Sequence, residues 1–305
     1  MENRPETYTL LALAERAEAL GFDSICVGDS VTARPRHDPL TLLAAVAART
    51  TSAELGTAVL LPALRQPTVL AHQLANIDQI SQGRLVLGLG VGWGLPAIVR
   101  EWEACGKNHR RRVRDLEEHI QVWRKLWSGA PVSMQGSDFK LTEQTIGPQP
   151  WTEKGPPILV TAGNRGEIIP AQIDRVGKFG DGIITTYVTE SDIRKLRDVC
   201  AEAMARHGRL DPNVPNFPLC VYTTVCIEND VAKAEAQTRE FLDKYYGGGV
   251  NFRGMMGLGP PAVVAEVLQR YAAAGVTDLC VRLVGENQVS QMRKFVSEIV
   301  PLISC

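Results

Sequence analysis

One stretch of the chain, residues 83–94, combines an apolar run with glycines at a spacing that could serve a ligand. Residues 85–89 lack a polar face, as does a strand buried on both sides. Glycines at every second position from Gly88 to Gly94 let a backbone bend sharply or approach a flat ligand. A dinucleotide-binding turn needs a glycine three residues after Gly90, where this chain has Trp93. The stretch therefore predicts either contact with a planar group beside Trp93 or a tryptophan that plugs the end of the fold.

A second glycine-rich segment, residues 162–166 (AGNRG), follows a short apolar run and precedes a helical pattern. Backbone N–H groups at such a junction can bind a phosphate, and Arg165 would add positive charge. An ordinary tight turn has the same pattern, so both interpretations stay open. The basic run at residues 110–114 could bind an anion, although such runs are more often solvated helix faces.

Two histidines stand where an acid or base could act. His37 lies in a polar loop after an expected strand, and His109 begins an expected helix. A lone histidine such as His37 is more often a surface or capping residue. No histidine has metal-ligand spacing to a second histidine or a cysteine, so we expect no metal site. No G-x-S-x-G motif is present, so acyl transfer has no support.

The composition is that of an ordinary soluble protein, with 305 residues, 45% hydrophobic and 22% charged. A net charge of -1 argues against nucleic acid or an anionic membrane as partner. No run has the length of a membrane span, and the first residues do not read as a signal peptide. The seven cysteines are scattered and form no C-x-x-C pair, which predicts a reducing cytoplasm.

Strand-like and helix-like segments alternate along the whole chain, which favours a single (β/α)8 barrel over residues 1–305. An open doubly wound sheet is the alternative, but no turn carries its dinucleotide fingerprint. Residues 129–156 and 247–261 read as excursions, the first a possible small hairpin and the second a loop that could act as a lid. The expected strands are residues 24–28, 55–61, 85–89, 157–162, 182–186, 219–227 and 278–284.

A barrel of this kind has one more strand than the pattern provides. The missing strand should precede the first helix, yet only Met1–Pro5 come before it. Either the start of the chain has been trimmed or another segment fills the gap.

Several segments resemble the bacterial luciferase-like family of flavin- and deazaflavin-dependent oxidoreductases. The likeness spans nearly the whole chain, and the order and spacing of its pieces make it specific. The matching segments are ALGFDSICVGDS (19–30), LGTAVLLPALRQP (55–67), LANIDQISQGRLVLGLGVGW (74–93), PPILVTAG (156–163), FGDGI (179–183) and YAAAGVTDLCVR (271–282).

The resemblance implies a TIM-like barrel that binds FMN or coenzyme F420 at the carboxyl ends of its strands. It also implies a cis peptide at Ala58-Val59, a ring beside Gly90–Trp93 and a phosphate at Gly163–Arg165. Its implied cofactor-binding residues are Asp29, Ser30, Thr57, Ala58, Val59, Gly90, Gly92, Trp93, Ala162, Gly163, Asn164, Arg165, Gly182 and Thr185.

The chain departs from the family pattern at two places. Many relatives have Asp-His where this chain has Asp29-Ser30, which leaves His37 and His109 as the candidate catalytic histidines. The deazaflavin sugar-phosphate dehydrogenases carry glutamate and asparagine where this chain has Trp93 and Pro96. These differences argue against a sugar-phosphate substrate, but not against the deazaflavin.

The resemblance leads to two alternatives for the reaction: hydride transfer with F420, or monooxygenation by reduced FMN and oxygen. Overall likeness to actinobacterial-type members, including the KNHRRR segment at 107–112, slightly favours F420. The rival of another class is a non-catalytic barrel that binds flavin or a protein partner. The family also implies a homodimer, with residues 39–50 and 67–81 as the expected contact. The small organic substrate cannot be read from the sequence, because the loops that would select it contain no motif.

Overall fold

The computed structural model describes residues 7–163, 166–211, 216–248 and 254–303. Contacts divide the chain into two units, which are described separately. The first holds residues up to 18 together with 22–160, and the second holds residues 19–21 and those from 161 onward. No helix in these described ranges is long and apolar enough to cross a membrane.

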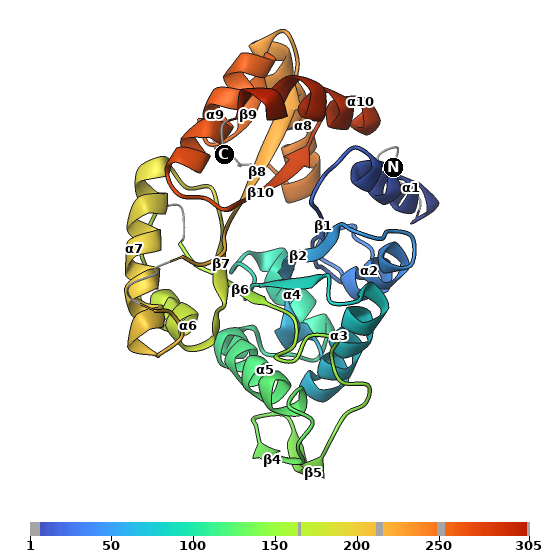
Figure 1. Ribbon diagram of the computed structural model, residues 1–305, viewed down its shortest axis with the longest axis vertical. Coiled ribbons are helices and arrows are strands. Elements are labelled where there is room, and N and C mark those ends of the chain that lie inside the picture. Colours follow the sequence, from blue (N-terminus) through green and yellow to red (C-terminus); the bar gives the residue numbers. More distant parts are fainter. Residues whose placement is uncertain (1–6, 164–165, 212–215, 249–253, 304–305) are drawn as a thin grey trace. The chain divides into compact units, whose positions relative to one another are not determined.

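Four parallel strands form the sheet of the first unit, in the order β1 (Ser24–Val27), β2 (Glu54–Leu60), β3 (Leu85–Leu89) and β6 (Ile158–Thr161). The expected buried strand is confirmed, because Leu85, Leu87 and Leu89 are fully buried. The helices are α1 (Thr7–Ala19), α2 (Pro39–Ala47), α3 (Pro67–Ser81), α4 (Pro96–Ala104) and α5 (Arg112–Leu126) (Figure 1).

Helix starts in this unit follow from proline and its neighbours. Each of α2, α3 and α4 has proline in its first turn, where the missing N–H is not needed. The carboxylate of Asp38 caps α2 by accepting the N–H groups of Leu40 and Thr41. The sequence therefore fixes where these helices begin, and with them the ends of the loops after β1 and β2.

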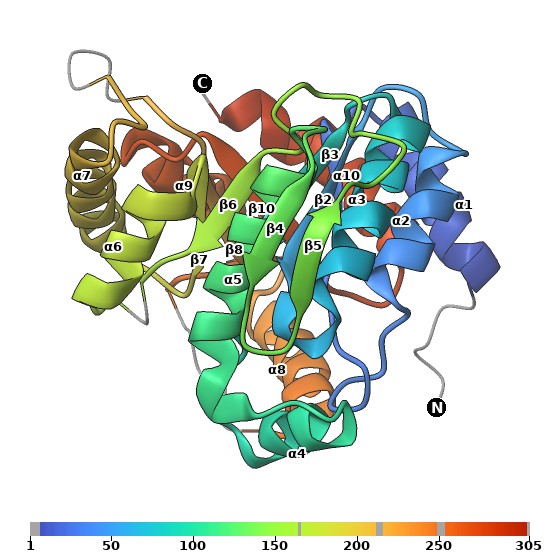
Figure 2. The ribbon, with the colours of Figure 1, turned by 90° about the horizontal axis from the view of Figure 1, so that it is seen from below.

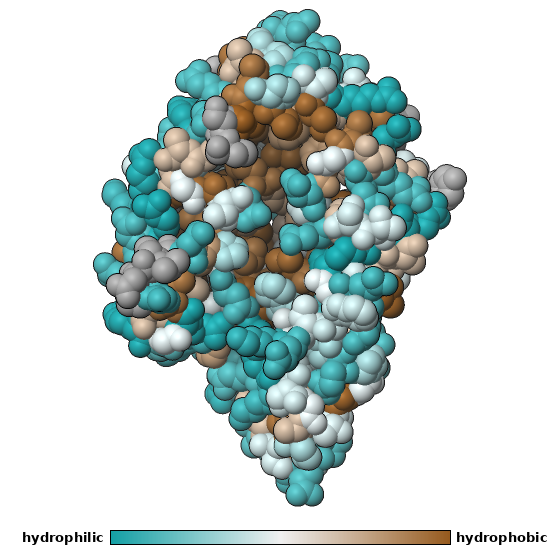
Figure 3. All heavy atoms as spheres, in the orientation of Figure 1, coloured by the Kyte–Doolittle hydropathy of each residue, from teal (hydrophilic) through white to brown (hydrophobic). Residues whose placement is uncertain are grey.

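The excursion at 129–156 contains the small hairpin that the sequence suggested. Its antiparallel strands are β4 (Val132–Gln135) and β5 (Lys140–Gln144). Figure 2 shows the two strands side by side, and Figure 3 shows largely hydrophilic residues over this part of the surface. Its turn is tied to α5, because the Ser137 hydroxyl and N–H both donate to Glu118.

The second unit has β7 (Gly182–Thr186), β8 (Leu219–Ile227) and β10 (Asp278–Leu283) in parallel, with β9 (Gly257–Gly259) beside the end of β8. Hydrophobic residues gather on the visible face over β8 and β10, and β10 is only partly buried (Figure 3). The helices are α6 (Pro170–Phe179), α7 (Glu190–Arg206), α8 (Val231–Tyr246), α9 (Pro261–Ala273) and α10 (Gln288–Lys294), followed by a π-helical turn, Phe295–Ile299.

The strand β9 corrects the interpretation of residues 247–261 as a loop. It has three residues, two of them glycine, and such a composition gives no strand signal. It is a strand because it pairs with β8, from Val225↔Gly257 to Ile227↔Gly259, and not because of the strand propensity of its residues. Counting β9, the two units contribute four parallel strands each within the described residues. The gap expected before α1 falls on residues 1–6, which lie outside the described residues.

Candidate active site

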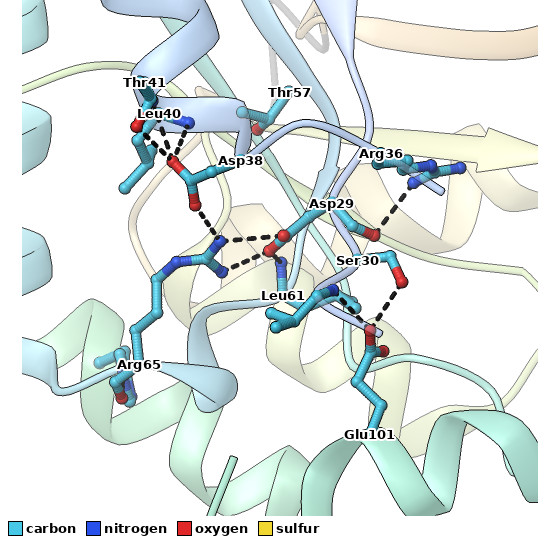
Figure 4. A network of polar contacts seen from close by, with 12 residues as sticks. Asp29, Ser30, Arg36, Asp38, Leu40, Thr41, Thr57, Leu61, Arg65 and Glu101 are labelled. Atoms are coloured by element: carbon cyan, nitrogen blue, oxygen red, sulfur yellow. Dashed lines mark hydrogen bonds and ion pairs between the residues drawn. The ribbon is translucent and has the colours of Figure 1, made fainter. Parts of the chain in front are cut away.

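Asp29, one of the expected cofactor-binding residues, is enclosed by protein groups at the end of β1. Its side chain is fully buried, and both carboxylate oxygens accept hydrogen bonds from the guanidinium of Arg65 (Figure 4). One of these oxygens also accepts the N–H of Leu61 at 2.9 Å. The carboxylate therefore joins the loop after β1 to the loop after β2.

Arg65 extends this contact to α2. Its Nη2 also reaches Asp38 Oδ2 at 2.8 Å, so one guanidinium bridges two carboxylates. Burial disfavours the charge of Arg65, but the two carboxylates outweigh it and raise the pKa of the guanidinium. Burial likewise opposes the charge of Asp38, and Arg65 nevertheless holds the pKa of Asp38 below its ordinary value. The network is a fixed, charged support beneath the loop at residues 29–38.

Ser30 occupies the position where many relatives have histidine, and its hydroxyl donates to Glu101 Oε1 at 2.6 Å. The same oxygen accepts three consecutive backbone N–H groups at 2.6, 2.9 and 3.0 Å, those of Val31, Thr32 and Ala33. Glu101 comes from α4, so this carboxylate binds the loop after β1 to the helix after β3 (Figure 4).

The environment of Glu101 keeps it ionised. Burial works against its charge, but the Ser30 hydroxyl and the three N–H groups hold the pKa of Glu101 below its ordinary value. Its second oxygen, Oε2, is buried and has no hydrogen-bond partner, and the same is true of Nε1 in the adjacent Trp102. Unpartnered buried polar atoms are uncommon, so this point in the fold can accept further hydrogen bonds.

Thr57 lies in β2 and is buried, and its hydroxyl donates to Gly88 O of β3 at 2.8 Å. The cis peptide expected at Ala58-Val59 is confirmed. At the end of β3, Gly90 N–H donates to Leu60 O at 2.9 Å. These residues therefore lie together at the ends of β2 and β3, where the sequence predicted a ring; their contact with a cofactor stays a prediction.

Gly92 has a specific reason to be glycine. Its φ is +69°, and an added Cβ would come within 2.8 Å of the Trp102 ring. The next residue, Trp93, is 42% exposed at the surface of this unit. Pro96 begins α4 and has no side-chain amide, unlike the asparagine that the resemblance implies for the sugar-phosphate dehydrogenases.

The two candidate histidines differ in their surroundings. His109 Nε2 lies 3.2 Å from Trp93 O, and its ring meets Trp102 edge-on with centroids 5.4 Å apart. A carbonyl only accepts, so Nε2 carries the proton and Nδ1 has the lone pair. Burial and the nearby Arg112 lower the pKa of His109, which keeps the ring neutral near pH 7. His37 is exposed, and neither catalytic role is tested by these contacts.

The second unit contains the remaining expected cofactor residues. Ala162 and Gly182 are buried, and Thr185 near the end of β7 has a buried hydroxyl without a hydrogen-bond partner. Gly163 has a φ of +80°, and a Cβ there would approach that hydroxyl to 3.2 Å. A glycine cradle beside an unpartnered hydroxyl fits a phosphate group. Asn164 and Arg165, expected to complete this site, lie outside the described residues.

Two residues of the network, Arg65 and Glu101, were missed by sequence reasoning. Arg65 lies in the quoted segment LGTAVLLPALRQP, directly after a strand, so its position was visible although its partners were not. Glu101 lies on an amphipathic helix among other charged residues, and only its complete burial distinguishes it. No spacing rule finds such a residue, because its partners lie about seventy residues earlier in the chain.

The family model of luciferase-like monooxygenases matches residues 3–275. The chain belongs to the luciferase-like monooxygenase family. An F420-dependent glucose-6-phosphate dehydrogenase from Nocardia farcinica is 33% identical over 238 residues, which cover 75% of this chain and 68% of that relative. The resemblance found in the sequence is thereby confirmed.

Solved structures of two oxidoreductases share the fold of this chain. An F420-dependent secondary alcohol dehydrogenase in complex with an F420-acetone adduct aligns with a TM-score of 0.84 and 18% identity, over 99% of this chain and 96% of its own. The FMN-bound oxygenating constituent of 3,6-diketocamphane monooxygenase from Pseudomonas putida aligns with a TM-score of 0.74 and 19% identity, over 100% and 96%. The luciferase-like chain is an α/β protein with parallel strands that matches these structures, and it is a flavin- or F420-dependent oxidoreductase.

Proposed function

We propose that this luciferase-like protein transfers hydride between coenzyme F420 and a small alcohol or carbonyl compound that is not a sugar phosphate. The likeness to F420-dependent glucose-6-phosphate dehydrogenase, at 33% identity, is the observation that carries the choice of cofactor. Trp93 and Pro96 support a different substrate, because neither can replace the glutamate and asparagine of those dehydrogenases. The deazaflavin ring of F420 would accept or supply the hydride.

The residues of the chain would hold the reactants and move the proton. Gly163 and Thr185 would bind the cofactor phosphate through a backbone cradle and one hydroxyl donor. Gly90, Gly92 and Trp93 would run beside the ring, where absent side chains allow close approach. Neutral His109 would take the hydroxyl proton at Nδ1 as the alcohol loses hydride to the cofactor, so that alcohol and oxidised F420 give carbonyl compound and reduced F420.

A binding titration tests the cofactor. Oxidised F420 and FMN are titrated separately into the purified protein, with cofactor fluorescence as the measurement. We expect F420 to bind at least about tenfold more tightly than FMN, a difference of about 1.4 kcal/mol. Loss of the visible absorbance of F420 with a panel of alcohols under anaerobic conditions then identifies the substrate class. Tighter binding of FMN, or binding of neither cofactor, would overturn the proposal.

A matched pair of variants locates the phosphate site. Thr185→Val removes only the unpartnered hydroxyl, and we expect it to weaken F420 binding several-fold. Thr238→Val makes the same change at another buried threonine, which lies on α8 beside Cys226, and should leave F420 binding unchanged. Equal effects of the two variants would exclude a specific role for Thr185.

We also propose that the protein acts as a cytoplasmic homodimer. Exposed Val69 and Ile80 lie on one face of α3, the helix expected at the contact. The scattered cysteines, which form no C-x-x-C pair in the sequence, support a reducing compartment.

A further inference from the structure

An arginine that no step above uses lies where three neighbouring strands of the second unit end. Arg282 is near the carboxyl end of β10, in register with Thr224 of β8. Tyr187 directly follows the last residue of β7. Parallel α/β folds bind ligands at the carboxyl ends of their strands. The position of Arg282 is therefore one from which a side chain can contact a ligand.

The guanidinium of Arg282 is surrounded by hydroxyls and aromatic rings. Its Nη1 donates to the Tyr246 hydroxyl at 2.9 Å, and Nη2 donates to Thr224 Oγ1 at 2.8 Å. The ring centroids of Tyr222, Phe241 and Tyr246 lie 5.2, 5.3 and 5.5 Å from its central carbon. Cation–π contact of this kind stabilises a guanidinium that has lost water.

The arginine has no anionic partner within the described part of the chain. The interactions found there are with tyrosines, a phenylalanine and a threonine, and no carboxylate is among them. The Nε atom is buried and has no hydrogen-bond partner, although the residue as a whole is partly exposed. Buried charges are normally paired, because removing a charge from water is costly. A missing anion would complete this arrangement.

The backbone at Tyr187 gives an independent sign of a specialised site. Tyr187 has a φ of +57°, in the left-handed region that bulky residues rarely adopt. Its side chain is buried and its hydroxyl is hydrogen-bonded to Arg282. Burial and the neighbouring Tyr246 raise the pKa of Tyr187 to about 12 even though Arg282 opposes the rise, so Tyr187 is a neutral partner and not the counter-ion. Such backbone strain is concentrated at ligand sites.

We propose that Arg282, with Tyr187 and Tyr246, forms a subsite for a carboxylate group of the substrate. The inference rests on the proposed function and deepens it, because it makes the substrate an organic acid. The aromatic rings cover the faces of the guanidinium, so the remaining donors lie at its edge. Nε and the second hydrogen of Nη2 form a planar fork there, which matches a carboxylate. Lysine could not replace it, since an ammonium has no such fork.

The test uses the full-length protein and benzoate, with benzamide as its neutral isostere. Binding is measured by calorimetry, with and without oxidised F420. We expect wild-type protein to bind benzoate at least about tenfold more tightly than benzamide. Arg282→Lys should lose most of this preference, because the ammonium keeps the charge but not the planar fork. Tyr187→Phe should reduce the preference several-fold. Arg209→Lys is the control, because Arg209 already pairs with Asp181 just before the amino end of β7.

Two separate measurements, F420 affinity and the preference for benzoate over benzamide, distinguish failure of the carboxylate subsite from failure of the proposed cofactor. Fluorescence titration of F420 in each variant shows whether the protein folds and still binds cofactor, and we expect Arg282→Lys to leave F420 affinity within about twofold. Loss of F420 affinity in Arg282→Lys alone would assign the arginine to the cofactor and overturn the inference. A wild-type protein that does not distinguish benzoate from benzamide would also overturn it, whether or not F420 binds.

Discussion

Glu101 and Glu18 each bind the backbone N–H groups of a loop with one carboxylate oxygen, but they differ in burial. Each glutamate presents one oxygen to three consecutive N–H groups and a serine hydroxyl: residues 30–33 for Glu101, and residues 51–53 for Glu18. Glu101 is fully buried, whereas Glu18 is close to the surface. Because hydrogen bonds to a charged acceptor are stronger where water is excluded, the buried glutamate should contribute more to stability.

Glu101→Gln is expected to lower the free energy of unfolding by about 2–3 kcal/mol, since hydrogen bonds to charged groups contribute about 1.5–3 kcal/mol each and the amide still accepts some of them. The amide nitrogen would also occupy the buried position of Oε2, which has no partner. Urea unfolding measures the change, and Glu18→Gln is the matched control with a smaller expected effect. Equal losses would show that burial of Glu101 adds nothing.

The contribution of Glu18 to the free energy of unfolding is expected to depend on pH. Hydrogen bonds from Ala53, Ser52 and Thr51 lower the pKa of Glu18 from 4.5 to about 2, although burial opposes the shift. A carboxylate with a lowered pKa in the folded state stabilises the fold fully above its unfolded pKa, and this contribution disappears as the pH falls from about 4.5 to about 2. The stability difference between wild type and Glu18→Gln should therefore be larger at pH 7 than at pH 3. A difference independent of pH would contradict this assignment.

At the scale of elements, α3 carries the prediction for assembly. Val69 and Ile80 are 55% and 50% exposed, and positions three turns apart share one helix face. Large apolar side chains in such a position are typical of a protein contact. We expect Val69→Glu and Ile80→Glu to convert a dimer to monomers in sedimentation experiments. Val263→Glu, at an exposed position of α9, is the control and should leave the assembly intact.

Most elements could be predicted from the sequence because their periodicity and end signals agree. Proline at the first turn places α2 and α3, and the apolar run places β3. The strand β9 could not be predicted, since its pairing with β8 and not its composition makes it a strand. Long-range pairing of this kind leaves no local signal.

Over the whole molecule, the sequence identified the family, because motifs in a fixed order survive where individual residues change. The charged support beneath the loop after β1 was not predictable, since Asp29, Arg65 and Glu101 come from three separate segments. Likewise, the local sequence around Arg282 does not predict its contacts with aromatic rings of β8 and α8. Local sequence patterns predict the secondary structure of a segment, whereas tertiary packing determines which distant side chains it contacts.

The carboxylate of Glu101 also limits how the loop after β1 can vary in length. Three successive N–H groups converge on one oxygen, so an inserted or deleted residue between Ser30 and Ala33 would turn at least one N–H away from it. The next N–H, that of Arg34, is also held, by the Ser30 hydroxyl. Asp38 fixes the far end as the cap of α2. Arg36 is held as well, because its Nη1 donates to Asp29 O at 3.0 Å. We therefore expect length variation in this surface loop to be confined to the residues around His37.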